Sequence, residues 1–231
     1  MKKITVAKSA GFCFGVDRAV KMVYGELEKN QRVATLGPII HNNDVVTDMK
    51  SKGARIIESV DELEKDELVV IRSHGVGRAV YEQIEKSGNR MVDATCPFVA
   101  RIHKIVSEKA AEGYFVLIAG DATHPEVQGI VGHCDENCLV FRDKTELKIF
   151  FEKKYKNLQK KLAIVAQTTY NIVVWEECLK IIPKDDPDIV IFDTICNATE
   201  ARQSDAEKLS KEADLMIVVG GRHSSNTVKL Y

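Results

Sequence analysis

The chain has 231 residues, 45% of them hydrophobic, which is enough for one large globular domain or two to three small ones. Lysine and arginine (33) nearly balance aspartate and glutamate (34), which excludes a global field that would recruit nucleic acid or an anionic membrane. No stretch approaches the length of a membrane-spanning helix, and Lys8 breaks the apolar start too early for a signal peptide. We therefore expect a cytoplasmic protein whose six cysteines are core thiols, metal ligands or nucleophiles rather than a disulfide framework.

Short β-branched runs alternate with longer amphipathic stretches along the whole chain. This alternation predicts an α/β fold with parallel sheets covered by helices, in which ligands bind beyond the carboxyl ends of the strands. The predicted strands are 4–7, 33–36, 68–72, 114–119, 162–166, 188–192 and 215–219.

Three cysteines lie where a predicted strand gives way to a helix, and they share a spacing. A polar residue lies 28 positions after each of them, just past the next predicted strand. The pairs are Cys13 with His41, Cys96 with His124, and Cys196 with Ser224. This repeat predicts three pseudo-symmetric α/β lobes around a common axis, over residues 1–94, 95–194 and 195–231, with the third lobe incomplete.

The lobes would bring one thiolate each to a common centre. Thiolates favour zinc, copper(I) or iron–sulfur clusters, and the start of a helix stabilises a thiolate through its N–H groups and dipole. Most four-iron clusters have four cysteine ligands, so three would leave one iron open. Taken singly, Cys13, Cys96 or Cys196 is better explained as a small core residue, and only their shared context favours metal ligands; Cys178 is predicted to be a core residue.

A second metal site is a weaker possibility. Cys134, Cys138 and the adjacent His133 form part of a zinc ligand set on one irregular segment, but no partner pair accompanies them. A zinc hydrolase is disfavoured because the chain has no His-Glu-x-x-His pattern. We expect His103 and His133 to be structural.

Three histidines, His41, His74 and His124, each follow a predicted strand and precede a helical stretch. Parallel sheets usually hold phosphates at this edge, and histidine donates hydrogen bonds to phosphate. The run Ser224-Ser225-Asn226 joins a strand to a helix start and is a candidate anion cradle, although an ordinary serine N-cap explains it too.

Glu126 lies one residue after Pro125, in the first turn of a predicted helix. A carboxyl group screened from water near a negative cluster has a raised pKa, which suits a proton donor. The alternative is a first-turn glutamate that only stabilises its helix. Thr168 is placed to hydrogen-bond either Glu126 or a substrate hydroxyl.

At this point the chain resembles the 4-hydroxy-3-methylbut-2-enyl diphosphate reductase (LytB/IspH) family from end to end. The motifs that carry the resemblance occur in the family's order and are jointly specific. They are Gly11-Phe12-Cys13-x-Gly15-Val16-Asp17-Arg18-Ala19, Ile40-His41-Asn42, Ser73-His74-Gly75-Val76, Asp93-Ala94-Thr95-Cys96-Pro97, His124-Pro125-Glu126-Val127, Gln167-Thr168-Thr169, Ile195-Cys196-x-Ala198-Thr199 and Ser224-Ser225-Asn226.

The resemblance implies an iron–sulfur oxidoreductase of the non-mevalonate isoprenoid pathway. It would reduce its allylic diphosphate to isopentenyl and dimethylallyl diphosphate with two electrons from ferredoxin or flavodoxin and two protons. The resemblance implies a [4Fe–4S] cluster with one open iron, held by Cys13, Cys96 and Cys196. It implies that the diphosphate is bound by His41, His74, His124, Ser224, Ser225 and Asn226. The implied catalytic residues are Glu126, Thr168 and His124. Family members continue beyond position 231, where they complete the third lobe. The alternative is a non-catalytic iron–sulfur redox sensor or cluster-binding protein, which needs no convergent histidines.

Overall fold

The computed structural model describes residues 4–29, 32–134, 137–183, 185–221 and 224–230. Within them, eight strands form two separate four-stranded sheets, and every strand pair is parallel. The first sheet contains β1 (Val33–Leu36), β2 (Arg55–Ile57), β3 (Leu68–Ile71) and β4 (Arg90–Asp93), and the second contains β5 (Phe115–Ala119), β6 (Cys138–Phe141), β7 (Leu162–Ala166) and β8 (Ile189–Ile191). The predicted α/β class is therefore confirmed.

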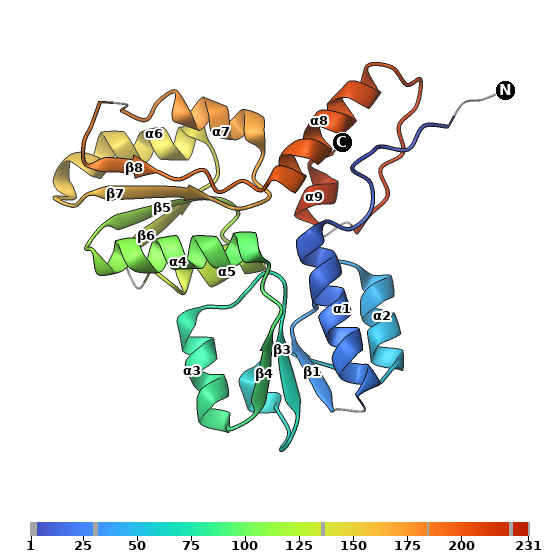
Figure 1. Cartoon of the computed structure of the whole chain (residues 1–231). Coiled ribbons are helices and arrows are strands. Elements are labelled where there is room, and N and C mark those ends of the chain that lie inside the picture. The colour runs from blue at the N-terminus through green and yellow to red at the C-terminus, as the bar shows by residue number, and fades with distance from the viewer. Residues whose placement is uncertain (1–3, 30–31, 135–136, 184, 222–223, 231) are drawn as a thin grey trace.

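Helices follow or precede nearly every strand (Figure 1). They are α1 (Phe14–Glu28), α2 (Asn43–Ser51), α3 (Arg78–Ser87), α4 (Pro97–Ala111), α5 (Pro125–Val131), α6 (Lys144–Lys153), α7 (Ile172–Leu179), α8 (Asn197–Ser210) and α9 (Ser225–Val228), with short 3₁₀ turns at Val60–Glu62 and Tyr155–Asn157. None of the helices in the described ranges is long and apolar enough to cross a membrane.

The two sheets have the same strand order, β2-β1-β3-β4 and β6-β5-β7-β8. At the carboxyl edge, Leu36 of β1 pairs with Ile71 of β3, and Ala119 of β5 pairs with Ala166 of β7. The matching registers make the residues that follow β1 and β3 equivalent to those that follow β5 and β7. This supports the duplication that the cysteine spacing predicts.

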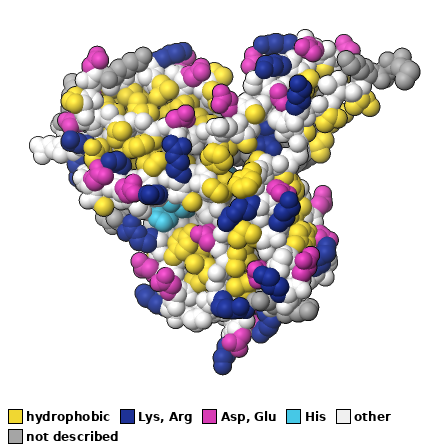
Figure 2. All heavy atoms as spheres, viewed as in Figure 1, with side chains coloured by type: hydrophobic (Ala, Val, Ile, Leu, Met, Phe, Trp, Pro, Cys, Tyr) yellow, Lys and Arg dark blue, Asp and Glu magenta, His cyan; other side chains and the backbone are white. Residues whose placement is uncertain are grey.

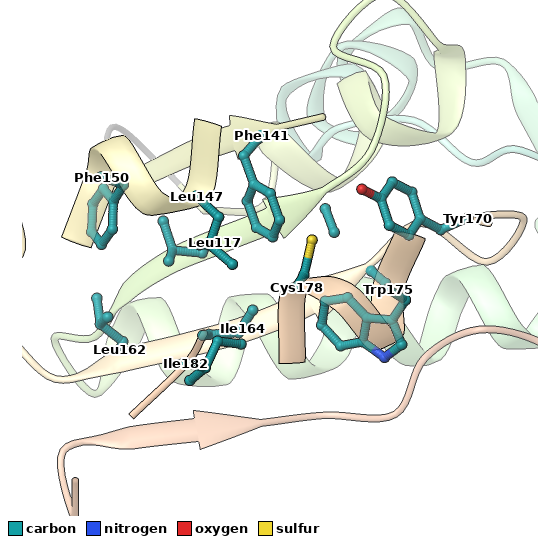
Figure 3. Close-up of a cluster of buried hydrophobic side chains, with 12 residues drawn as sticks. Leu117, Phe141, Leu147, Phe150, Leu162, Ile164, Tyr170, Trp175, Cys178 and Ile182 are labelled. Carbon is teal, nitrogen blue, oxygen red and sulfur yellow. The ribbon is translucent and has the colours of Figure 1, made fainter. Parts of the chain in front are cut away.

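The central strands are buried because helices cover both faces of each sheet. All four residues of β1 and of β3, and all five of β7, are buried. On one face of the second sheet, Leu117 and Ile164 pack with Phe141, Trp175 and Cys178 into an apolar cluster (Figure 3). Two rigid sheets therefore fix the positions of the loops at their carboxyl edges.

The part of the chain after β8 contains α8 and α9, and with the N-terminal segment it forms a third body beside the two sheets (Figure 1). Ser9 N donates to Asp205 Oδ2 at 3.0 Å, and Arg202 Nη2 donates to the Gly11 carbonyl at 2.7 Å. These contacts tie the start of the chain to α8.

Two strand predictions were wrong, namely 4–7 and 215–219, which have no strand structure. Ile4, Leu215, Ile217 and Val219 are 89%, 78%, 79% and 90% exposed, and apolar side chains are visible on this part of the surface (Figure 2). Because an isolated extended segment has no neighbour to accept its backbone hydrogen bonds, apolar alternation alone does not make it a strand.

Candidate active site

Each of the three predicted cluster cysteines is the N-cap residue of a helix. Cys13 precedes α1, Cys96 precedes α4 and Cys196 precedes α8, and none of the three side chains makes a capping hydrogen bond. Backbone hydrogen bonds place two of them in equivalent ways: Cys96 N donates to the Ser73 carbonyl at 2.9 Å, and Cys196 N donates to the Thr168 carbonyl at 3.0 Å. Cys96 and Cys196 thus follow β4 and β8, whereas Cys13 follows no strand in the described part of the chain, contrary to the sequence prediction. All three start helices, where free N–H groups favour negative charge.

Cys13 and Cys196 both act electrostatically on the Cys96 thiol. Burial raises the pKa of Cys96, the N–H groups of Phe98 and Val99 oppose this, and thiolates at Cys13 and Cys196 are close enough to raise it further. A Cβ on Gly15 would stand 2.4 Å from Cys96 Sγ, so only glycine leaves room for the thiol at this point of α1. The structure therefore brings together residues that lie in three different parts of the sequence.

Three histidine rings form a second cluster. His41 follows β1, His74 follows β3, and His124 is the N-cap of α5 after β5. The ring centroids are 4.4 Å apart for His41 and His74, 5.4 Å for His41 and His124, and 5.5 Å for His74 and His124. One ligand atom from each ring lies within 4.8 Å of the other two. The sequence prediction that these side chains converge agrees with this geometry.

The histidine cluster favours neutral imidazoles. Burial lowers the pKa of His74 well below its usual value, and His41, His124 and Arg72 lower it further. Burial also lowers the pKa of His124 to about 4, with further contributions from His41 and Lys229. His124 Nδ1 accepts a hydrogen bond from Glu126 N at 3.1 Å, which leaves the proton of the neutral ring on Nε2.

Glu126 is only 2% exposed and is bound to Thr168 by two hydrogen bonds. Thr168 N donates to Oε1 at 2.6 Å, and Thr168 Oγ1 donates to Oε2 at 2.8 Å. These bonds favour the carboxylate, but burial outweighs them and raises the pKa of Glu126. Of the two partners that the sequence left open for Thr168, the structure shows Glu126.

Ser224 is the N-cap of α9 and accepts a hydrogen bond from Thr227 N at 3.4 Å. Ser225 Oγ accepts one from Thr169 Oγ1 at 2.9 Å, and Asn226 Oδ1 accepts one from Thr199 Oγ1 at 3.4 Å. The predicted anion cradle therefore lies against the loop that follows β7, and its serine N-cap is present as well.

Sequence reasoning missed two charged residues beside the histidines. Arg72 follows β3 directly, and Lys229 follows α9, where its Nζ donates to the Thr169 carbonyl. Burial lowers the pKa of both groups. Arg72 is the last residue of the predicted strand 68–72, whereas β3 ends at Ile71. A charged residue that closes an otherwise apolar run was the signal that could have marked Arg72 as part of the site.

The other cysteines and histidines take structural positions. Cys178 is fully buried in the apolar cluster of the second sheet, as predicted. Cys134 is buried with its Sγ donating to the Ile130 carbonyl, and it hydrogen-bonds Cys138. His133 stacks on His103 instead, with centroids 4.3 Å apart, and its Nε2 is 3.0 Å from the Val76 carbonyl. This arrangement does not support the zinc alternative.

Comparison with known proteins gives one consistent result. Residues 4–231 match the LytB protein family. The chain is similar to two proteins named 4-hydroxy-3-methylbut-2-enyl diphosphate reductase. The one from Caldanaerobacter subterraneus subsp. tengcongensis is 43% identical over 99% of this chain and 78% of its own length. The one from Clostridioides difficile is 42% identical over 98% of this chain and 80% of its own length.

Solved structures agree with the sequence comparison. The chain is similar to the E-1-hydroxy-2-methyl-but-2-enyl-4-diphosphate reductase from Plasmodium falciparum, with a TM-score of 0.88 and 30% identity over 95% of this chain and 69% of that one. A structure described as (E)-4-hydroxy-3-methyl-but-2-enyl diphosphate reductase, the terminal enzyme of the non-mevalonate pathway, has a TM-score of 0.73 and 38% identity over 99% of this chain and 80% of that one. The chain belongs to the LytB family of iron–sulfur enzymes.

Proposed function

We propose that the protein is a 4-hydroxy-3-methylbut-2-enyl diphosphate reductase and carries out a two-electron reductive dehydroxylation. The observation that carries the proposal is a buried acid, Glu126, which is hydrogen-bonded to His124 of the three-histidine cluster and to Thr168, whose carbonyl accepts a hydrogen bond from Cys196 N. In the reaction the allylic C–O bond breaks, two electrons and two protons are taken up, and water leaves with isopentenyl or dimethylallyl diphosphate. The names of the relatives support this activity.

We propose Cys13, Cys96 and Cys196 as the ligands of a [4Fe–4S] cluster with one open iron. The fit rests on three thiols that share one helix-start position and on the space that Gly15 leaves beside Cys96 Sγ. Soft thiolate ligands and nearby N–H groups suit an iron–sulfur cluster. When bound, such a cluster supplies electrons and a Lewis acid for the substrate oxygen.

The proposed diphosphate site consists of the histidine cluster and the residues Ser224, Ser225 and Asn226. Neutral imidazole, hydroxyl and amide groups all donate hydrogen bonds to phosphate oxygens. Three histidines this close also suit a metal ion, but Arg72 and Lys229 add positive charge that reaches His124. A divalent cation is repelled by that charge and an anion is attracted, so the surroundings favour the diphosphate.

Glu126 is proposed as the proton donor to the leaving hydroxyl. Burial raises the pKa of Glu126, so the carboxyl group holds its proton to higher pH than an exposed glutamate does, and the two hydrogen bonds from Thr168 fix its orientation. His124 is hydrogen-bonded to the backbone of Glu126 and is the next candidate for proton transfer. A redox sensor needs the cysteines but has no use for this buried acid.

The electron donor is proposed to be ferredoxin or flavodoxin, because both deliver single electrons at low potential. We also propose that the protein works in the cytoplasm. These two statements follow from the family resemblance and from the absence of any disulfide among the cysteines, all six of which are free.

The test is anaerobic reconstitution with iron and sulfide, followed by turnover of the diphosphate with a chemical reductant. We expect both isomeric products together with water. A Cys96→Ser variant should lose iron, sulfide and turnover, whereas Cys178→Ser should keep all three because Cys178 is a core residue. Normal cluster content in Cys96→Ser would reject the ligand assignment, and reconstituted protein without turnover would reject the proposed activity.

A further inference from the structure

Arg72 lies between the two strands that lead to His41 and His74. It follows β3 directly and precedes His74 by two residues. A Cβ on Gly37, the residue after β1, would stand 2.4 Å from Arg72 Nη1. The φ angle of Gly37 is 71°, so its backbone conformation favours glycine. The guanidinium therefore lies against the residue that follows β1, at the carboxyl edge of the first sheet.

Arg72 is half-buried, and part of its guanidinium has no partner. Its Nε is buried and has no hydrogen-bond partner among the described residues, and the same holds for Nδ1 of His74. The negative charge of Glu58 acts on the guanidinium, but its effect on the Arg72 pKa is smaller than that of burial. Arginine keeps its proton in proteins, so Arg72 stays a cation in this position. Burying a cation without full compensation costs free energy, and a bound anion would offset that cost.

The positive charge of Arg72 reaches the histidine cluster. It lowers the pKa of His74 and of His124, and Lys229 acts on His124 from the third part of the chain. Since burial lowers the pKa of His74 and of His124, these two rings offer hydrogen bonds but little charge to a diphosphate. A fixed cation at the same edge supplies the charge that they lack.

We propose that Arg72 is a positioning residue for the substrate, a fixed positive charge that holds the diphosphate on the histidine cluster. This inference rests on the proposed diphosphate site. It assigns a role to a residue that none of the motifs includes, and it explains why Gly37 and the half-buried guanidinium occur together.

The test is calorimetric titration of the anaerobically prepared chain with inorganic diphosphate in magnesium-free buffer. Arg72→Gln should weaken binding about tenfold or more, because one full charge is removed close to a multiply charged anion. The matched control is Arg32→Gln. Arg32 lies at the amino end of β1, at the opposite edge of the same sheet, where it is exposed and paired with Glu64. Its substitution should leave binding unchanged.

Arg72→Lys distinguishes charge from packing. If charge is what matters, this variant should bind diphosphate within about threefold of wild type, on the same Coulomb reasoning. The other charged or titratable groups acting on this region are Glu58, His41, Asp121, Glu126 and Lys229, and all are unchanged in the variants.

Two results would overturn the role of Arg72. One is equal binding by wild type and folded Arg72→Gln, and the other is a tenfold loss in a folded Arg72→Lys variant. If Arg72→Gln does not fold, as judged by circular dichroism, the lysine variant decides alone by the same limits. A wild-type chain that binds no diphosphate would reject the proposed site itself, which is a different outcome from equal binding by the variants.

Discussion

Glu126 illustrates how two opposing effects act on one carboxyl group. Two hydrogen bonds from Thr168 favour the charged form, whereas nearly complete burial favours the neutral form and prevails. The hydrogen bonds fix the orientation of the carboxyl group, and burial makes it harder to deprotonate than an exposed glutamate. A first-turn glutamate that only stabilised its helix would instead lie at the surface, where the helix N-terminus favours negative charge.

Replacing Glu126 by glutamine tests the proton-donor role. The amide keeps the shape but carries no transferable proton, so single-turnover reduction of the diphosphate should slow by about 10²- to 10⁴-fold. Iron content and binding of inorganic diphosphate should remain as in wild type. Turnover near the wild-type rate would move proton delivery to His124 or to a bound phosphate.

His74 provides a test of the diphosphate site. Replacing it by alanine removes a hydrogen-bond donor to a charged phosphate and should weaken binding of inorganic diphosphate about 10- to 100-fold. The iron content should not change, because none of the proposed cluster ligands is altered. Comparing the diphosphate substrate with its non-phosphorylated alcohol would show whether the lost binding energy belongs to the phosphate end. Unchanged diphosphate binding in this variant would place the site elsewhere.

At the scale of elements, the start of a helix is the recurring device of the site. α1, α4 and α8 each begin directly after a cysteine, and α5 begins after His124. Because the first N–H groups of a helix have no partner within it, these ends favour thiolates and anions. The same local structure therefore serves both proposed ligands.

Gly15 on α1 offers a test of this packing. In Gly15→Ala the added Cβ would stand 2.4 Å from Cys96 Sγ, so the thiol must move and reconstitution should yield clearly less iron per chain than wild type. The matched control is Gly25→Ala on the same helix, where a Cβ meets nothing within 4 Å. That control should keep its iron and gain about 0.5–1 kcal/mol of stability. Equal iron content in both variants would contradict the close approach of α1 to Cys96.

The sequence predicted the central elements better than the edges. The strand 33–36 was predicted with the bounds that the structure shows, because a short, fully buried run next to turn residues is typical of a central strand. β2, β4 and β6 were missed: β2 has three residues, and the side chains of β4 are mostly exposed. The opposite error at 215–219 has the same origin, since pairing with a neighbour decides whether an edge segment is a strand.

For the site, sequence reasoning found the residues that a repeated spacing marks, such as Cys96 and His124. It could not find Arg72, because the proposed role of Arg72 depends on its place beside the loop that follows β1. Gly37, in that loop, is 35 positions earlier in the chain than Arg72. Contacts between segments so far apart carry no local signal. The hydrogen bonds between Thr168 and Glu126 belong to the same class, and the sequence could only offer them as one of two possibilities.

At the scale of the whole molecule, a stacked histidine pair joins the parts built on the two sheets. His103 on α4 is 6% exposed and packs against Gly75, which follows β3, and against Gly129 on α5. Its partner His133 contacts the Val76 carbonyl through Nε2. Burial, together with His133, lowers the pKa of His103 to about 3. The interface therefore requires His103 to be neutral.

This pair predicts a loss of stability in mild acid. Since the folded-state pKa lies below the unfolded value of about 6.5, the unfolded chain binds the extra proton, and stability falls as the pH drops from about 6.5 towards 3. At pH 5, His103 alone should cost about 2 kcal/mol relative to pH 7.5. Urea unfolding of wild type and His103→Gln at both pH values measures this. The glutamine variant should show a correspondingly smaller difference between the two pH values, and an equal difference would show that other groups cause the acid sensitivity.

The three helix-capping cysteines also have a consequence for the chain as a polymer. Cys13 and Cys96 are 83 positions apart, and Cys96 and Cys196 are 100 positions apart. A cluster bound to all three, as proposed, acts as a cross-link that closes two long loops. Closing one loop of about 100 residues lowers the entropy of the unfolded chain by an amount worth about 4–5 kcal/mol. Oxygen that destroys such a cluster would therefore remove a cross-link as well as a redox centre, and the protein in air would become easier to unfold and to digest.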